Sequence, residues 1–122
     1  MTDADTANKK FRKELNSGTV ALVLLAVLGR ASEPMYGYQI AKHIEKRKEG
    51  VLGMKQAALY PVLRSLESSG LLESRIEPSV SGPPRRYYTI TVSGREALTQ
   101  WEAIWHQTKT FVDDALKGTQ ND

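Results

Sequence analysis

Near the middle of the chain, the spacing of apolar residues changes from a helical period to a strand period, and this change limits the possible folds. In "KQAALYPVLRSLESSG" the apolar side chains recur at i, i+3, i+4 and i+7, on one face of a helix: Leu59, Val62, Leu63 and Leu66. In "RRYYTITV", apolar side chains alternate with period two from Tyr88 to Val92, and "LLESRIEP" supplies a partner strand. We predict a helix that ends at Gly70, followed by a β-hairpin with the tip "SVSGPP".

Two further helices precede this unit. "MYGYQIAKHIEKRKEG" carries apolar residues at helical spacing, and "VALVLLAVL" indicates a buried helix from Thr19 to Gly29, entered through Ser17 and Gly18. That apolar run is much shorter than the roughly twenty residues of a membrane span, so we expect no membrane insertion. The first eight residues are expected to be frayed, and "KKFRKEL" to be a solvated helix start.

The last segment is predicted to be a helix from Ser93 to Lys117. "SGRE", from Ser93 to Glu96, has the spacing of a capping box. Beyond it, apolar and neutral residues step by three and four alternately, as in a heptad seam. The seam consists of Leu98, Trp101, Trp105, Thr108, Val112 and Ala115, flanked by Ala97, Ile104 and Phe111.

Helix, short turn, helix and hairpin, in that order, are typical of a winged helix-turn-helix. The fold class expected is therefore mainly α with a small β-hairpin, with a long C-terminal helix added. We divide the chain into residues 1–92, which hold the N-terminal helix and the winged unit, and residues 93–122, which hold the last helix and a tail.

Such a unit suits DNA, because an α-helix fits the major groove and a hairpin can lie against the flanking backbone. On the second helix, Gln56, Tyr60 and Arg64 stand four residues apart and are expected opposite the apolar face. Arginine can read guanine, glutamine can read adenine, and a tyrosine hydroxyl can contact phosphate. Lys55 adds a charge at the N-terminal end. The alternative is an ordinary exposed polar face.

The hairpin carries its own candidate contact in "SGPPRRYY", where Arg85 and Arg86 follow two stiffening prolines. We expect both arginines to contact phosphates or to enter the minor groove. The alternative is that the two arginines belong to an ordinary solvent-exposed loop with no binding role. The net charge of +3 and the pI near 9.2 are compatible with a nucleic-acid partner without requiring one.

Three segments closely resemble the PadR family of bacterial transcription regulators: "MYGYQI", "ALYPVLRSLESSGLLES" and "GPPRRYYTITVSGREAL". The resemblance covers about Thr19 to Val112. It implies a homodimer that binds a two-fold symmetric DNA operator, and usually repression of a nearby gene. It places the recognition helix at residues 55–69, the wing at residues 71–92 and the dimerisation helix at residues 93–117. One departure is Lys55, where the family often has a small polar capping residue.

Some members of this family release DNA when a small aromatic molecule binds, and multidrug-sensing members carry a tryptophan that corresponds to Trp105. The resemblance therefore makes Trp101 and Trp105 candidate ligand-binding residues. The alternative is that they only fill the dimer interface, which we expect to include Leu98, Trp101, Trp105, Phe111 and Val112.

Catalysis is not expected. His43 and His106 lie on separate predicted helices, and the adjacent Asp113 and Asp114 diverge on a helix. No nucleophile elbow, phosphate-binding glycine loop or metal-ligand cluster is present in the sequence, so no cofactor or metal is predicted. The absence of cysteine fits a cytoplasmic protein. The competing function is a winged-helix dimer that contacts other proteins, which would depend on salt far less than DNA binding does.

Overall fold

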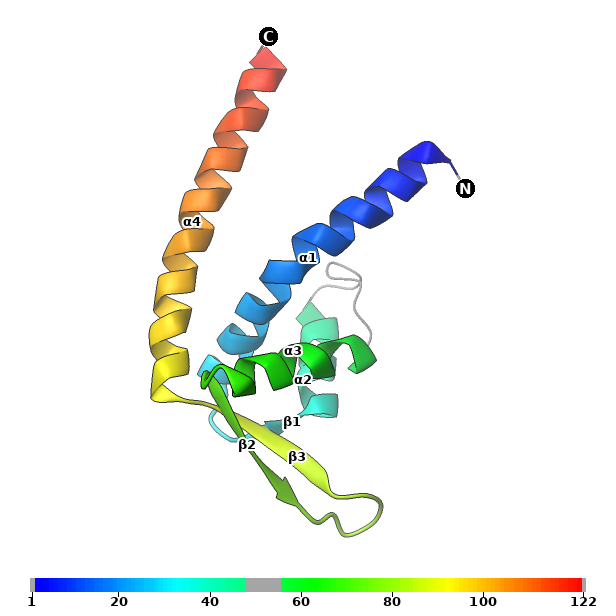
Figure 1. Cartoon of the computed structure of the whole chain (residues 1–122), viewed down its shortest axis with the longest axis vertical. Helices are drawn as coiled ribbons and strands as arrows, with labels where there is room; N and C mark the ends of the chain where they lie inside the picture. The colour runs from blue at the N-terminus through cyan, green and yellow to red at the C-terminus, as the bar shows by residue number, and fades with distance from the viewer. Residues whose placement is uncertain (1, 48–55, 122) are drawn as a thin grey trace.

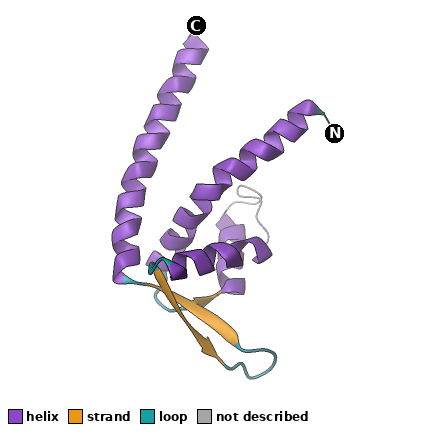
Figure 2. Cartoon of the chain, viewed as in Figure 1, coloured by secondary structure: helices purple, strands orange, loops and turns teal. Residues whose placement is uncertain are grey.

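The computed structural model describes residues 2–47 and 56–121, which form four helices and a small sheet (Figure 1). In chain order the elements are α1 (Asp3–Arg30), β1 (Met35–Tyr36), α2 (Gly37–Arg47), α3 (Gln56–Ser68), β2 (Leu72–Glu77), β3 (Arg85–Ile90) and α4 (Val92–Asn121). Helices dominate, and the strands gather at one end of the molecule (Figure 2). The predicted fold class is confirmed. The predicted Lys55 lies outside the described residues.

Helix α1 is longer than predicted, because Ser17 and Gly18 do not interrupt it. It starts with a capping box in which the Thr2 hydroxyl accepts from the Asp5 amide, and it runs without a break to Arg30. A single glycine in a helix costs only about 1 kcal/mol relative to alanine, and the apolar half of α1 is held by packing. The expectation of a frayed start and a separate helix from Thr19 was therefore wrong.

The sheet has a third strand that the sequence pattern did not reveal. Strand order is β1-β3-β2, with both pairs antiparallel. In β1, Met35 pairs with Tyr88 and Tyr36 pairs with Tyr87. A strand of two residues shows no alternation, so periodicity could not detect it. Its consequence is that the start of α2 is joined to the hairpin, which we call the wing (residues 72–90).

The core lies where α1, α2, α3 and the base of the wing meet. Its buried residues are Val20, Leu24, Leu25, Leu28, Ile40, Ala41, Leu59, Leu63, Leu66, Leu72 and Tyr88. They include the predicted apolar face of α3, apart from Val62, which is only partly buried. The core therefore fixes the orientation of α3 relative to the wing.

Helix α3 ends at a glycine, as predicted. Gly70 has a φ of +80°, and the amides of Gly70 and Leu71 donate to the carbonyls of Glu67 and Leu66, both at 2.9 Å. This is a Schellman motif, which favours glycine at the left-handed position.

Helix α4 begins differently from the prediction, because Thr91, and not Ser93, supplies the capping oxygen. The Thr91 hydroxyl accepts from the Gly94 amide at 2.9 Å and donates to the Gly70 carbonyl at 2.7 Å. The helix then runs from Val92 to Asn121, past the predicted end at Lys117. Thr91 thus joins the end of α3 to the start of α4.

Candidate nucleic-acid interface

An open groove of about 450 Å³ lies between α3 and the wing. It is lined by Tyr60, Arg64, Glu67, Ser68, Arg86 and Tyr88. Three of the predicted contact residues therefore line one groove: Tyr60 and Arg64 from α3, and Arg86, which is distant in sequence, from the wing. The groove presents two guanidinium groups beside the helix that the sequence predicts to read DNA.

Arg86 is held in the groove by a chain of two hydrogen bonds. Its Nη1 donates to the Ser74 hydroxyl at 2.9 Å, and that hydroxyl donates to Glu67 Oε2 at 2.6 Å. Ser74 lies on β2 and Glu67 on α3, so the chain links the wing to the helix. Neither residue was predicted as part of the site, because their contact with Arg86 depends on the strand register, in which Ser74 pairs with Tyr88.

Tyr60 corrects one expectation. We predicted it to be exposed opposite the apolar face, but it is partly buried and packs against the core. Its ring lies against Gly37 at the start of α2, where a Cβ atom would be 2.9 Å from the hydroxyl. Tyr60 directly follows the buried Leu59 on α3, so it lies at the border of the apolar face. Arg64 is exposed, as predicted.

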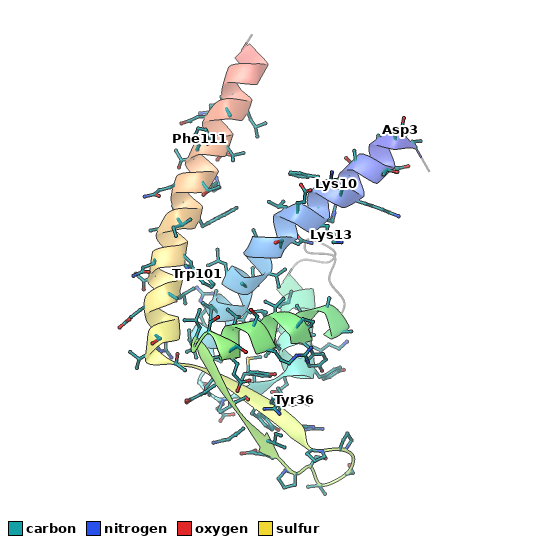
Figure 3. The ribbon with its side chains drawn as sticks, in the orientation of Figure 1. Asp3, Lys10, Lys13, Tyr36, Trp101 and Phe111 are labelled. Atoms are coloured by element: carbon teal, nitrogen blue, oxygen red, sulfur yellow. The ribbon has the colours of Figure 1, made fainter. Side chains whose placement is uncertain are left out.

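Arg85 and Arg86 lie on opposite faces of the wing, because adjacent residues in a strand alternate. Arg86 faces the groove. The guanidinium of Arg85 lies over the ring of Tyr36, with its Cζ 4.4 Å from the ring centroid. Figure 3 shows Tyr36 beside β3. Both arginines are exposed and lie within β3, with Arg85 at its first position.

Gln56 is the first residue of α3. It therefore lies at the end of the helix that meets bases in helix-turn-helix proteins. Pro61 lies inside the same helix and is exposed. Its ring removes one backbone donor from the helix.

The groove also contains one buried phenol. Burial raises the pKa of Tyr88 above its usual value, and Glu67 raises it further, against the opposing effect of Arg86 and Arg64. Tyr88 therefore stays neutral at physiological pH, and the two arginines carry the positive charge of the groove.

The predicted seam on α4 divides into two parts. Leu98 and Trp101 are partly buried against the chain's own core, and Leu98 packs against Gly29 of α1. Trp105, Phe111 and Val112 are 39%, 73% and 47% exposed. Phe111 lies on the part of α4 that diverges from α1 (Figure 3). This second part leaves an apolar surface without cover in the single chain.

No helix in the described ranges, 2–47 and 56–121, combines the length and the apolar character needed to cross a membrane. Within the same residues, no three histidine or acidic side chains are grouped as metal ligands would be.

Comparison with known proteins agrees with this geometry. Residues 24–100 match the family model described as "Transcriptional regulator PadR-like family". The matched region contains α2, α3 and the wing completely, together with the first part of α4.

Solved structures share the fold. The chain is similar to a PadR family transcriptional regulator from Eggerthella lenta, with 34% identity, a TM-score of 0.74, and coverage of 93% of this chain and 95% of that one. A PadR-like transcriptional regulator from Bacillus cereus is 27% identical, with a TM-score of 0.68 and coverage of 84% and 96%. Bacillus subtilis PadR, solved in complex with operator DNA, is 23% identical, with a TM-score of 0.61 and coverage of 69% and 46%.

Proposed function

The chain belongs to the PadR-like family of transcriptional regulators, and we propose that it binds a specific DNA operator as a homodimer and represses transcription. The observation that carries this proposal is the groove lined by both Arg64 of α3 and Arg86 of the wing. The complex of Bacillus subtilis PadR with operator DNA supports the choice of partner.

In this proposal the two elements have different tasks. Helix α3 enters the major groove, where Gln56 and Arg64 meet base edges that differ from one base pair to the next. The wing enters the flanking minor groove, where Arg86 contacts a phosphate of the bounding backbone and carries no sequence information. The hydrogen bonds from Arg86 through Ser74 to Glu67 keep the wing cation in a fixed position relative to α3.

Selection from a random duplex library, followed by sequencing of the bound fraction, tests this function. We expect a two-fold symmetric motif whose half-sites lie about one helical turn apart. Binding should weaken by roughly one log unit per log unit of salt for each phosphate contact. An absence of enrichment, with binding that barely depends on salt, would contradict the proposal and favour a protein-contacting dimer.

The homodimer is proposed to form through the uncovered part of α4. Val112→Asp should convert the dimer to a monomer, because a carboxylate would be buried among apolar side chains without a partner. Analytical ultracentrifugation measures the result. Thr110→Asp introduces the same charge on the opposite side of α4 and should leave the dimer intact. A Val112→Asp protein that sediments as the wild type would place the interface elsewhere.

We also propose that a planar aromatic molecule releases the operator by stacking on Trp105, with Trp101 beside it in the dimer. The partial exposure of Trp105 supports this proposal, because a stacking surface must be reachable. Once the library has given an operator, adding planar aromatic compounds to the bound complex tests release. A broad panel that leaves the complex intact would rule out those compounds.

We infer that the protein is a regulator and not an enzyme, in keeping with a family of transcriptional regulators. A protein that regulates transcription in a bacterium must reach the chromosome, so we place its action in the cytoplasm.

A further inference from the structure

A strip of two stacked aromatic rings with a cation at each end runs from α2 across β1 to the wing. Its members are Lys42, Tyr38, Tyr36 and Arg85, and we call them the cation–aromatic strip. Lys42 Nζ lies 5.5 Å from the centroid of Tyr38, and the Tyr38 and Tyr36 rings stack at 6.4 Å and 23°. At the other end, Arg85 Cζ lies 4.4 Å from the Tyr36 centroid. Both cations are therefore held against aromatic faces, which attract positive charge.

The backbone places Tyr36 at the centre of this arrangement. Its amide donates to the Gln39 side chain at 3.1 Å, which fixes the turn from β1 into α2. Its partner across the sheet is Tyr87, whose ring meets it edge to face at 5.4 Å. Tyr36 is thus oriented from two sides while its ring face receives Arg85.

The strip is too exposed to be explained as core packing. Tyr38 is 48% exposed, and Lys42 and Arg85 are both exposed. The carboxylate opposite Arg85 in the sheet register is Glu77, and it pairs at 2.9 Å with Arg75. The strip therefore presents two exposed cations, each placed over an aromatic ring.

The strip and the groove lie on opposite sides of the wing. Arg86 faces the groove beside α3, and Arg85 belongs to the strip on the other face of the wing. A hairpin that enters a groove of duplex DNA has a phosphate backbone on either side of it, since each groove is bounded by both strands. Cations on both faces of the wing match that environment.

We propose that the cation–aromatic strip is a second phosphate-binding surface, which contacts the backbone on the side of the wing away from the recognition helix. This inference rests on the proposed function. Tyr36 and Tyr38 act as positioning residues, since a cation already held on a ring loses less conformational freedom when it meets a phosphate. Lys42 and Arg85 make the contacts. The strip adds affinity and salt dependence but reads no sequence.

The test compares variants on one random-sequence duplex of 30 base pairs, by fluorescence anisotropy across a KCl series. Lys42→Ala should lower the log–log salt slope by about 0.9 per protomer and weaken binding roughly five-fold per protomer at 0.15 M salt. Lys117→Ala removes the same charge near the far end of α4 and should change neither quantity. Equal behaviour of the two variants would overturn the proposal.

The positioning role is tested at Tyr36. Tyr36→Phe keeps the ring face and should keep the wild-type affinity, whereas Tyr36→Leu should weaken binding as Arg85→Ala does. The side-chain protons of Arg85 should show a ring-current shift in the Phe variant and lose it in the Leu variant, as NMR measures. Equal affinities for the Phe and Leu variants would overturn the role of the ring. If Tyr36→Leu fails to fold, the comparison of Lys42→Ala with Lys117→Ala decides whether the strip binds phosphate.

Failure of this inference differs from failure of the proposed function. Wild-type protein that shows no salt-dependent binding to any duplex would contradict both. Wild-type binding with a steep salt slope that Arg86→Ala reduces, but Lys42→Ala does not, would overturn only the strip.

Discussion

Joint replacement of Arg64 and Arg86 by alanine is expected to weaken DNA binding by several hundred-fold at 0.15 M salt. In the proposed dimer, the two Arg86 residues lose two phosphate contacts, and counterion release contributes roughly five-fold for each at this salt concentration. The two Arg64 residues lose contacts to bases, each of which contributes about 1 kcal/mol or more. The log–log salt slope should fall by about two, because only the Arg86 contacts are made to phosphate. Fluorescence anisotropy with the selected operator, repeated across a KCl series, measures both quantities.

A matched control variant removes two positive charges at positions outside the groove. Arg30 lies at the end of α1 and Lys117 near the end of α4, and both are exposed. The Arg30→Ala, Lys117→Ala protein should keep most of its affinity. If this control weakens binding as much as the groove variant, net charge and not the groove determines affinity, and the central observation behind the proposed function is lost.

The second large effect is expected at Gly94, near the start of α4. A Cβ atom added there would overlap the Leu71 carbonyl oxygen and lie 2.7 Å from Ile90 Cγ1. That carbonyl accepts from the Thr91 amide at 3.1 Å, so it cannot move without breaking the junction. Gly94→Ala should lower the free energy of unfolding by about 3 kcal/mol, the upper part of the range for overpacking. Urea denaturation at fixed protein concentration measures this change.

Gly18 provides the control for the same chemical change. It lies inside α1, and a Cβ atom added there meets nothing within 4 Å. Gly18→Ala should therefore raise the free energy of unfolding by about 0.5–1 kcal/mol, the ordinary gain in an exposed helix. If Gly94→Ala also stabilises the protein, the contact between α4 and the end of α3 is looser than the structure indicates.

Sequence periodicity was sufficient for the fold class but not for all the boundaries. The helical face around Leu63 and the alternation around Tyr88 are strong signals, because burial of one face enforces them. The strand β1 is too short to show a period. The capping residue Thr91 bonds to the nearby Gly94 and also to Gly70, which is distant in sequence. Local patterns contain no information on such contacts.

The two arginines of the candidate site were predictable from the sequence, but most other residues of the groove and their arrangement were not. Arg64 and Arg86 were identified from their types and places in the chain. The opposite orientations of Arg85 and Arg86 follow from strand alternation alone. In contrast, the hydrogen bonds from Arg86 to Glu67 depend on the register between β2 and β3, which one sequence does not fix. Tyr36 was assigned to helix α2, so its role beneath Arg85 was missed.

The junction at Thr91 has a mechanical consequence. One side chain fastens the last turn of α3 to the first turn of α4, and Arg95 adds a hydrogen bond of 3.3 Å to the Gly29 carbonyl of α1. The base of helix α4 is therefore held by hydrogen bonds to the end of α3 and to α1, so that α4 and the recognition helix should move as one rigid unit. In a dimer built on α4, a tilt of roughly 10° acting over roughly 20 Å would move each recognition helix by about one base-pair step. The crossing angle of two α4 helices would then set the distance between the two recognition helices, and with it the spacing of the half-sites in the DNA.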